Sequence, residues 1–212
     1  MTEAVLDRLA IRELLENWAI WRDSGDWERF RTVWHGDGFM MATWFQGTAA
    51  EFIRVSKDGF ERGVPKGFSI LHFLGGSSID LAGHRAVAQT KMTISQRAPI
   101  HQEGHDVLVD VLCTGRFYDF LEKREGRWGL VTRRVCYEKD RMDPVNPAET
   151  VKLDPEVLKQ FPVGYQHLGY LQAGLGFKVK TNLPGLFGPA NDELYAYGKA
   201  WLAGGPIDGV RK

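Results

Sequence analysis

The apolar residues of this chain change their spacing near residue 70, and this change restricts the fold more than any other feature. Over residues 5–21 they recur every three or four positions, the period of an amphipathic helix. After residue 70 they alternate or run continuously, as in strands. The strand-like segments are 70–74, 77–81, 85–96, 107–120 and 128–139. Helices followed by consecutive strands, without βαβ alternation, predict an α+β domain in which a curved antiparallel sheet wraps around N-terminal helices.

Turn and capping residues divide the N-terminal part into several elements. The first helix is expected to end at Asp23-Ser24-Gly25, and Asp26 to cap a second, short helix. The inward side of that helix includes Phe30 and either Val33 or Trp34. A strand-like run over 39–45 and a helix over 49–60 are expected to follow.

The region after residue 143 has a different character. Residues 143–147 read Asp-Pro-Val-Asn-Pro, and residues 144–212 hold most of the prolines and many glycines. Asp154 followed by Pro155 is typical of a helix start. We therefore expect two parts: an α+β domain over 1–143 and a C-terminal arm over 144–212, which packs on the domain or on a neighbouring subunit.

Composition limits the possible partners and compartments. The 212 residues carry 27 Lys and Arg against 27 Asp and Glu, so a basic surface for nucleic acid is not expected. The sequence shows neither a secretion signal nor a long apolar span, so we expect a cytoplasmic protein with no membrane partner. Cys113 and Cys136, the only two cysteines, are expected to be reduced core neighbours, with a redox pair as the alternative.

Common signatures of cofactor and metal chemistry are missing. The chain contains no glycine-rich phosphate loop, dinucleotide fingerprint, paired CxxC, HExxH or GxSxG motif. His101 and His105 are four residues apart but flank Gly104 in a polar turn. We interpret them as surface residues, with metal ligands as the alternative.

Two segments favour acid–base chemistry. Asp23 lies at the end of an amphipathic helix whose apolar face enters the core, and His72 lies in an otherwise apolar strand. A carboxylate can orient such a histidine so that it accepts protons near neutral pH. The alternative is a buried histidine with a structural role only.

The order of these segments resembles the SnoaL-like branch of the nuclear-transport-factor-2-like superfamily over about residues 5–143. The resemblance rests on the Asp corner, on His-Phe-Leu-Gly-Gly at 72–76, and on the segments 115–119, 126–128 and 133–134. It implies a cone-shaped α+β fold, a cystatin-like α+β barrel, with a deep apolar cavity and assembly into a homodimer or homotrimer.

Within that superfamily, the two segments are most similar to the scytalone dehydratases. The resemblance places the catalytic Asp at Asp23 and the catalytic His at His72, and it implies no metal and no organic cofactor. The sequence departs from that family in three places. Arg22 precedes the Asp, residues 40–44 supply no tyrosine, and the family's second histidine falls near Gln96 or Arg97. Dehydration of scytalone itself is therefore not expected.

Further side chains are candidates for binding substrate or stabilising an oxyanion. An arginine in the cavity could stabilise an oxyanion or phenolate, and a tyrosine could donate a proton. These candidates are Arg97, Arg116 and Arg133, Tyr118 and Tyr137, and Trp44. Each could equally be an ion-paired or core residue.

Together these features predict a cofactor-independent lyase that eliminates water or formaldehyde from a hydroxylated aromatic or diaryl compound. The arm is similar to extensions of bacterial SnoaL-like proteins, including lyases that release formaldehyde from lignin-derived diaryl compounds. The alternatives are a polyketide cyclase or ketosteroid-type isomerase, a non-catalytic ligand-binding module, and a dioxygenase small subunit. Catalysis requires Asp23 and His72 within hydrogen-bond reach of each other and facing the cavity.

Overall fold

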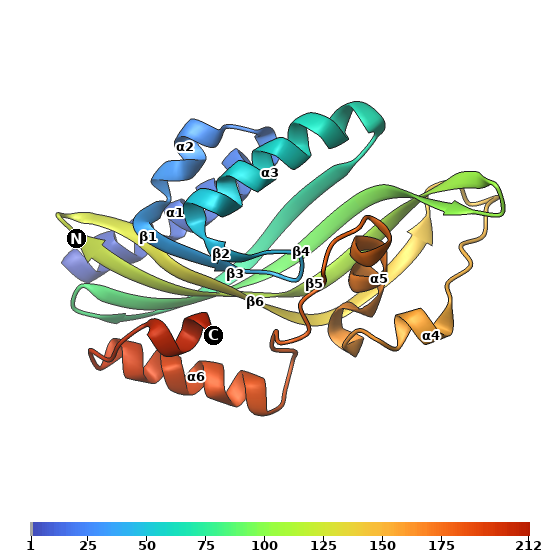
Figure 1. Ribbon diagram of the computed structural model, residues 1–212. Coiled ribbons are helices and arrows are strands. Elements are labelled where there is room, and N and C mark those ends of the chain that lie inside the picture. The colour runs from blue at the N-terminus through green and yellow to red at the C-terminus, as the bar shows by residue number, and fades with distance from the viewer. Residues whose placement is uncertain (1) are drawn as a thin grey trace.

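A computed structural model describes residues 2–212 and shows three helices, a long meander of strands and a helical arm (Figure 1). The N-terminal elements are α1 (Glu3–Ser24), α2 (Trp27–Thr32), β1 (Trp34–Met41), β2 (Gln46–Thr48) and α3 (Ala49–Gly63). The meander consists of β3 (Ser69–Ala82), β4 (Arg85–Gln102), β5 (His105–Arg124) and β6 (Arg127–Pro144). The arm contains α4 (Pro155–Leu158), α5 (Gln166–Gly174) and α6 (Pro189–Leu202). Short 3₁₀ turns occupy Val64–Lys66, Val163–Tyr165 and Asp208–Arg211.

The six strands form one curved, open sheet in the order β2-β1-β6-β5-β4-β3. Two-residue turns with positive φ join β4 to β5 at Glu103-Gly104 and β5 to β6 at Glu125-Gly126. This is the turn geometry that matches the twist of long antiparallel strands. The expected α+β fold with a curved sheet is therefore confirmed.

The sheet differs from the expectation in one pairing and two boundaries. β1 pairs with β6 in parallel. The last strand of the meander, β6, lies beside β1, which comes before the meander in the chain. The runs 70–74 and 77–81 form a single strand whose pairing shifts between Leu74 and Ser77, at the flexible pair Gly75-Gly76. Trp34, expected on the second helix, begins β1 instead.

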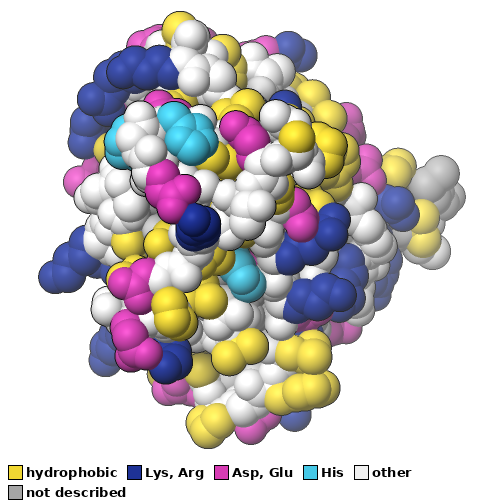
Figure 2. All heavy atoms as spheres, turned by 90° about the vertical axis from the view of Figure 1, so that its right-hand side faces the viewer, with side chains coloured by type: hydrophobic (Ala, Val, Ile, Leu, Met, Phe, Trp, Pro, Cys, Tyr) yellow, Lys and Arg dark blue, Asp and Glu magenta, His cyan; other side chains and the backbone are white. Residues whose placement is uncertain are grey.

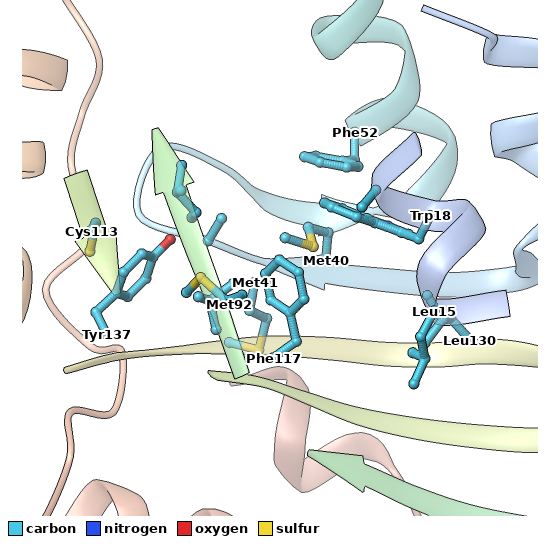
Figure 3. Close-up of a cluster of buried hydrophobic side chains, with 14 of the residues drawn as sticks. Leu15, Trp18, Met40, Met41, Phe52, Met92, Cys113, Phe117, Leu130 and Tyr137 are labelled. Atoms are coloured by element: carbon cyan, nitrogen blue, oxygen red, sulfur yellow. The ribbon is translucent and has the colours of Figure 1, made fainter. Parts of the chain in front are cut away.

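The main core lies between the sheet and α1–α3. Figure 3 shows Trp18 of α1 and Phe52 of α3 facing each other, with Phe117 of β5 below them. The rings of Trp18 and Phe52 are nearly parallel, with centroids 6.4 Å apart. Leu168 and Leu171 of the arm belong to the same buried cluster. The arm thus completes the core of its own chain.

The opposite face of the sheet is covered by α6 (Figure 1). Leu194 and Trp201 of this helix pack in a second buried cluster with Tyr118 and Phe120 of β5. Cys136 belongs to this second cluster, whereas Cys113 belongs to the main core. Both thiols are free and buried, as expected, but they lie on opposite faces of the sheet and are not neighbours.

Two features bear on possible partners: the length and polarity of the described helices, and the distribution of charged side chains in the view of Figure 2. Within residues 2–212, no helix is both long and apolar enough to cross a bilayer. Figure 2 shows acidic and basic side chains intermixed over one end of the molecule.

Replacing Gly198 with alanine is expected to destabilise the protein by about 1–3 kcal/mol, the usual cost of overpacking. A Cβ at this position of α6 would collide with the buried hydroxyl of Tyr118. Gly59 is the matched control, because a Cβ in the middle of α3 would meet no atom within 4 Å. Gly59→Ala is therefore expected to be neutral or stabilising by up to about 1 kcal/mol. Urea unfolding of both variants checks this, and equal stability would show that α6 does not pack on β5 as described.

Candidate functional site

The side chains of Asp23 and His72 form a hydrogen-bonded pair between α1 and β3. Asp23 Oδ1 lies 2.8 Å from His72 Nδ1, and Asp23 Oδ2 accepts a hydrogen bond of 2.5 Å from the backbone N–H of His72. With Nδ1 carrying the proton that Asp23 accepts, Nε2 holds the free lone pair. No group within residues 2–212 hydrogen-bonds to Nε2. The pair thus has the geometry of an oriented base.

Local features of the sequence place this pair. Gly25 ends α1 in the left-handed conformation, with φ of 74°, so the chain turns away directly after Asp23 and Ser24. β3 is an edge strand, so N–H groups on its free side need partners from outside the sheet. Asp23 supplies one such partner at His72. A carboxylate at a helix C-terminus is unfavourable for the helix dipole, and these donors offset that cost.

His72 is enclosed by aromatic rings. Its side chain is 7% exposed, and the ring of Trp18 meets it edge-on with centroids 5.1 Å apart. The ring of Phe117 lies 6.1 Å away. Burial lowers the pKa of His72 below the ordinary value of 6.5, although the hydrogen bond and charge of Asp23 oppose this shift. The imidazole is therefore neutral at pH 7, the state in which it accepts a proton.

A buried cation lies on the far side of these rings. Arg133 of β6 is fully buried and pairs with Asp119 of β5 through contacts of 2.7 and 2.8 Å. Its guanidinium carbon lies 4.0 Å from the ring centroid of Phe117 and 4.3 Å from that of Trp18. Arg133 Nη1 is buried without a hydrogen-bond partner. A positive charge with a free donor thus lies one ring away from His72.

A cavity of about 840 Å³ opens beside the pair, between α3, the start of β3 and the arm. This volume lies in the range of sites for small organic ligands. Apolar side chains form one part of its wall, namely Trp44, Val55, Phe60, Val64, Phe68, Ile70, Leu71, Leu175 and Phe177, and the charged side chains of Arg54, Asp58, Arg62 and Lys66 form another. Arg22, Asp23 and Ile70 line the cavity, whereas His72 is not among the lining residues. The cavity therefore reaches the carboxylate partner of the histidine but not the histidine itself.

The other predicted site residues fall in different places. Trp44 lines the cavity, and Arg133 is close to the histidine as described. Tyr137 is buried in the main core, where its hydroxyl lies 3.4 Å from the backbone nitrogen of Thr43, and burial raises its pKa. Neither Tyr137 nor Arg133 is part of the cavity wall.

Three further predicted residues also lie outside the cavity wall. Arg97 forms an ion pair with Asp110 on the adjacent strand, with a shortest contact of 2.6 Å. Arg116 hydrogen-bonds to Asn191 of α6, and Tyr118 is buried under the same helix. The expectation that Arg97 and Arg116 stabilise an oxyanion in the cavity, and that Tyr118 donates a proton there, is corrected by these positions.

The structure adds three polar residues that sequence reasoning missed. Ser56 of α3, Gln96 of β4 and Gln172 of α5 are each less than 10% exposed and line the cavity. Gln96 was noted in the sequence only because the second histidine of the scytalone dehydratase pattern falls near Gln96 or Arg97, and not as a site residue. For Ser56, its position on the buried face of an amphipathic helix was a usable signal. Gln172 gave no comparable signal, because the arm's packing was unknown.

The histidine turn has no metal-site geometry. His101 pairs with Asp106 on the same hairpin, and both side chains are more than 60% exposed. Within residues 2–212, no group of three or more His, Cys, Asp or Glu side chains converges.

Comparisons with known proteins agree with this fold. The SnoaL-like domain matches residues 3–134. Pea pathogenicity protein 2 of the fungus Fusarium vanettenii is 40% identical over 96% of this chain and 88% of its own length.

Two solved structures are similar in fold at low sequence identity. A candidate scytalone dehydratase of Novosphingobium aromaticivorans superimposes with a TM-score of 0.51 at 15% identity, covering 70% of this chain and 97% of its own. A hexachlorocyclohexane dehydrochlorinase superimposes with a TM-score of 0.50 at 14% identity, covering 72% of this chain and 96% of its own. On the domain match and the 40% identity, the chain belongs to the SnoaL-like domain family of the nuclear-transport-factor-2-like superfamily.

Proposed function

We propose that this protein is a cofactor-independent lyase that eliminates water or formaldehyde from a hydroxylated aromatic or diaryl compound. The observation that carries the proposal is the hydrogen-bonded Asp23–His72 pair beside a large cavity with aromatic walls. The names of the two solved proteins of similar fold, a dehydratase and a dehydrochlorinase, both denote eliminations and support the same class of reaction.

In the proposed reaction, His72 is the general base and Asp23 its positioning residue. For loss of water, Nε2 takes a proton from carbon, the C–H electron pair forms the new double bond, and the C–O bond breaks. The imidazolium then returns the proton to the departing hydroxide, which leaves as water. Asp23 stabilises the imidazolium through the bond to Nδ1. Arg133 is fully buried, paired with Asp119 and absent from the cavity wall, so no contact with the developing oxyanion is assigned to it.

Loss of formaldehyde uses the same base on a different proton. Nε2 takes the proton of a primary hydroxyl, whose O–H pair becomes the carbonyl bond of formaldehyde. The C–C bond breaks, and its electron pair forms a double bond while hydroxide leaves the neighbouring carbon. The imidazolium protonates this hydroxide, so protons and electrons balance without an oxidant.

A ligand-binding module is the second candidate function, and one observation favours it. His72 is not among the residues that line the cavity, so catalysis requires the bound substrate to open a path to it. A module that only binds its ligand needs no such opening. An isomerase or cyclase would use the same base and release no fragment.

Mass spectrometry separates these functions. A panel of hydroxylated aromatic dimers and polyketide-like compounds is incubated with the protein and with His72→Ala in buffer containing a chelator. Loss of 18 mass units for water, or of 48 for formaldehyde together with the water formed from the departing hydroxide, is expected with the wild type alone. Unchanged masses with a new chromatographic peak would mean isomerisation, and unchanged substrate throughout would overturn the enzyme proposal.

The pH dependence of kcat/KM is expected to show a single acidic limb below pH 6.5. The base must be neutral, so activity rises as pH increases through the pKa of His72, which burial holds below 6.5. Since Asp23 raises that pKa, Asp23→Asn should move the limb to lower pH as well as slow the reaction. Initial rates between pH 4.5 and 8.5 test this. A limb centred above pH 6.5, or one that Asp23→Asn leaves in place, would contradict the assignment.

A further inference from the structure

Three polar atoms along the cavity wall are buried without a hydrogen-bond partner. They are Arg22 Nε of α1, Ser56 Oγ of α3 and Gln172 Oε1 of α5. The three residues are 6%, 3% and 4% exposed, respectively. Buried polar atoms are paired in most proteins, and each one left unpaired costs about 1–3 kcal/mol. Three of them around one cavity indicate groups that a bound molecule satisfies.

The chemistry of these atoms specifies what the bound molecule must offer. Arg22 Nε is a donor only, so it needs an acceptor oxygen. Gln172 Oε1 is an acceptor only, so it needs a donor such as a hydroxyl, and Ser56 Oγ can serve either role. Nη1 of Arg22 is already committed to Asp23 and to the backbone oxygen of Ile70. The apolar walls accept a ring system, so the ligand combines aromatic surface with hydroxyl groups.

The position of Gln172 makes the C-terminal arm part of the binding site. Asp140 of β6 holds the start of α5: its Oδ2 accepts the backbone N–H of Leu168 at 2.8 Å, and its Oδ1 lies 2.8 Å from His167 Nδ1. Asp140 is fully buried, so this attachment is shielded from solvent. Gln172 and Leu175 follow on the same short segment and reach the cavity. A chain that ended with the SnoaL-like domain at residue 134 would lack this wall.

We infer that the arm supplies a specificity residue, Gln172, which selects ligands that present an aromatic hydroxyl group. Gln172 Oε1 accepts the hydroxyl proton, while Arg22 Nε donates to an oxygen acceptor of the same ligand. This inference deepens the proposed function, because it names the group by which the substrate is recognised. It concerns binding and not the chemical step.

Binding of two matched probes tests the inference. 4-Hydroxybiphenyl and biphenyl differ by one hydroxyl, and equilibrium dialysis measures the Kd of each. The wild type is expected to bind 4-hydroxybiphenyl about tenfold more tightly, the worth of one good hydrogen bond. Gln172→Leu keeps a similar volume and removes the acceptor, so the preference should fall to about twofold or less while the Kd for biphenyl changes little. Gln160→Leu, on an exposed residue of the same arm, should retain the wild-type preference.

Several outcomes would overturn the inference. Equal binding of the two probes by the wild type would mean that water already satisfies Gln172, and failure of both to bind would mean that the cavity does not accept this class. An unchanged preference in Gln172→Leu would remove Gln172 from recognition. Thermal unfolding of Gln172→Leu checks that it is folded, and loss of a buried unpaired atom should leave it at least as stable as the wild type.

The same experiment separates this inference from the proposed function. His72→Ala retains Arg22, Ser56 and Gln172, so it should keep the preference for the hydroxylated probe although it has lost the base. If the wild type shows the preference but transforms no compound of the panel, the enzyme proposal fails and the binding inference stands. If the wild type is active but the preference is absent or independent of Gln172, the enzyme proposal stands and the binding inference fails.

Discussion

Replacing His72 with alanine is expected to lower kcat by about 10²–10⁴-fold, the usual contribution of a positioned general base. The loss should appear in kcat and not in substrate affinity, because His72 is not part of the cavity wall. Single-turnover rates and the Kd of the substrate, measured separately, check both parts of this expectation. A weaker Kd for the substrate of similar size, with an unchanged single-turnover rate, would show that His72 binds substrate and does not catalyse.

Two further variants distinguish loss of the base from loss of structure. In His72→Asn, the side-chain amide can still donate a hydrogen bond to Asp23 in place of Nδ1, but it provides no basic nitrogen. This variant should therefore be as inactive as His72→Ala while unfolding closer to the wild type. His101→Ala is the matched control, because His101 also pairs with a carboxylate but is exposed, and it should keep full activity. Substantial activity in His72→Asn would contradict the role of Nε2.

Replacing Asp119 with alanine is expected to destabilise the protein by about 3–5 kcal/mol, because it leaves Arg133 as an uncompensated buried charge. Both side chains are fully buried, and the contacts of 2.7 and 2.8 Å are the only carboxylate contacts of Arg133 among the described residues. For a chain of this length, such a loss lowers Tm by about 6–20 °C. Differential scanning calorimetry of Asp119→Ala measures it.

The double variant Asp119→Leu with Arg133→Met tests the physical reason for this effect. If the cost comes from the unpaired charge, replacing both partners by apolar side chains should recover most of the lost stability. Glu16→Ala removes the carboxylate of an exposed ion pair, with Arg12, and should change stability by less than about 0.5 kcal/mol. A double variant as unstable as Asp119→Ala would show that packing, and not charge, decides the effect.

The arm is shared with relatives beyond the conserved domain boundary. The SnoaL-like domain accounts for residues 3–134, whereas the fungal pea pathogenicity protein 2 matches 96% of the chain. The arm adds side chains to both buried clusters and Gln172 to the cavity. In this chain it is thus a structural part of the protein, and not an addition outside the fold.

The local pattern of the sequence was sufficient for the elements and for two of the site residues. Helical and strand periods, the cap at Asp26 and the glycine turns depend on interactions within a few residues, so they can be read without knowing the fold. Asp23 and His72 were visible for the same reason: each is a polar residue in an apolar sequence context, Asp23 at the end of an amphipathic helix and His72 between Leu71 and Phe73. Their hydrogen bond follows from the packing of α1 against the edge strand β3.

Which side of the sheet each remaining side chain points to was decided by the tertiary structure alone. A strand with one buried face shows alternation, but residues 117–121 of β5 and 128–137 of β6 are covered by α1–α3 on one side and by α6 on the other, so every position in these stretches is buried. Without alternation there, the side of the sheet that Arg133 faces could not be read from the sequence. Gln172 became part of the cavity only because Asp140 attaches α5 to the sheet, a contact between residues 28 positions apart. The sequence by itself determined which elements form and where a base is available. The docking of the arm and the covering of both sheet faces decided which side chains surround that base. Both depend on contacts between segments that are distant in the sequence, and no local pattern encodes such contacts.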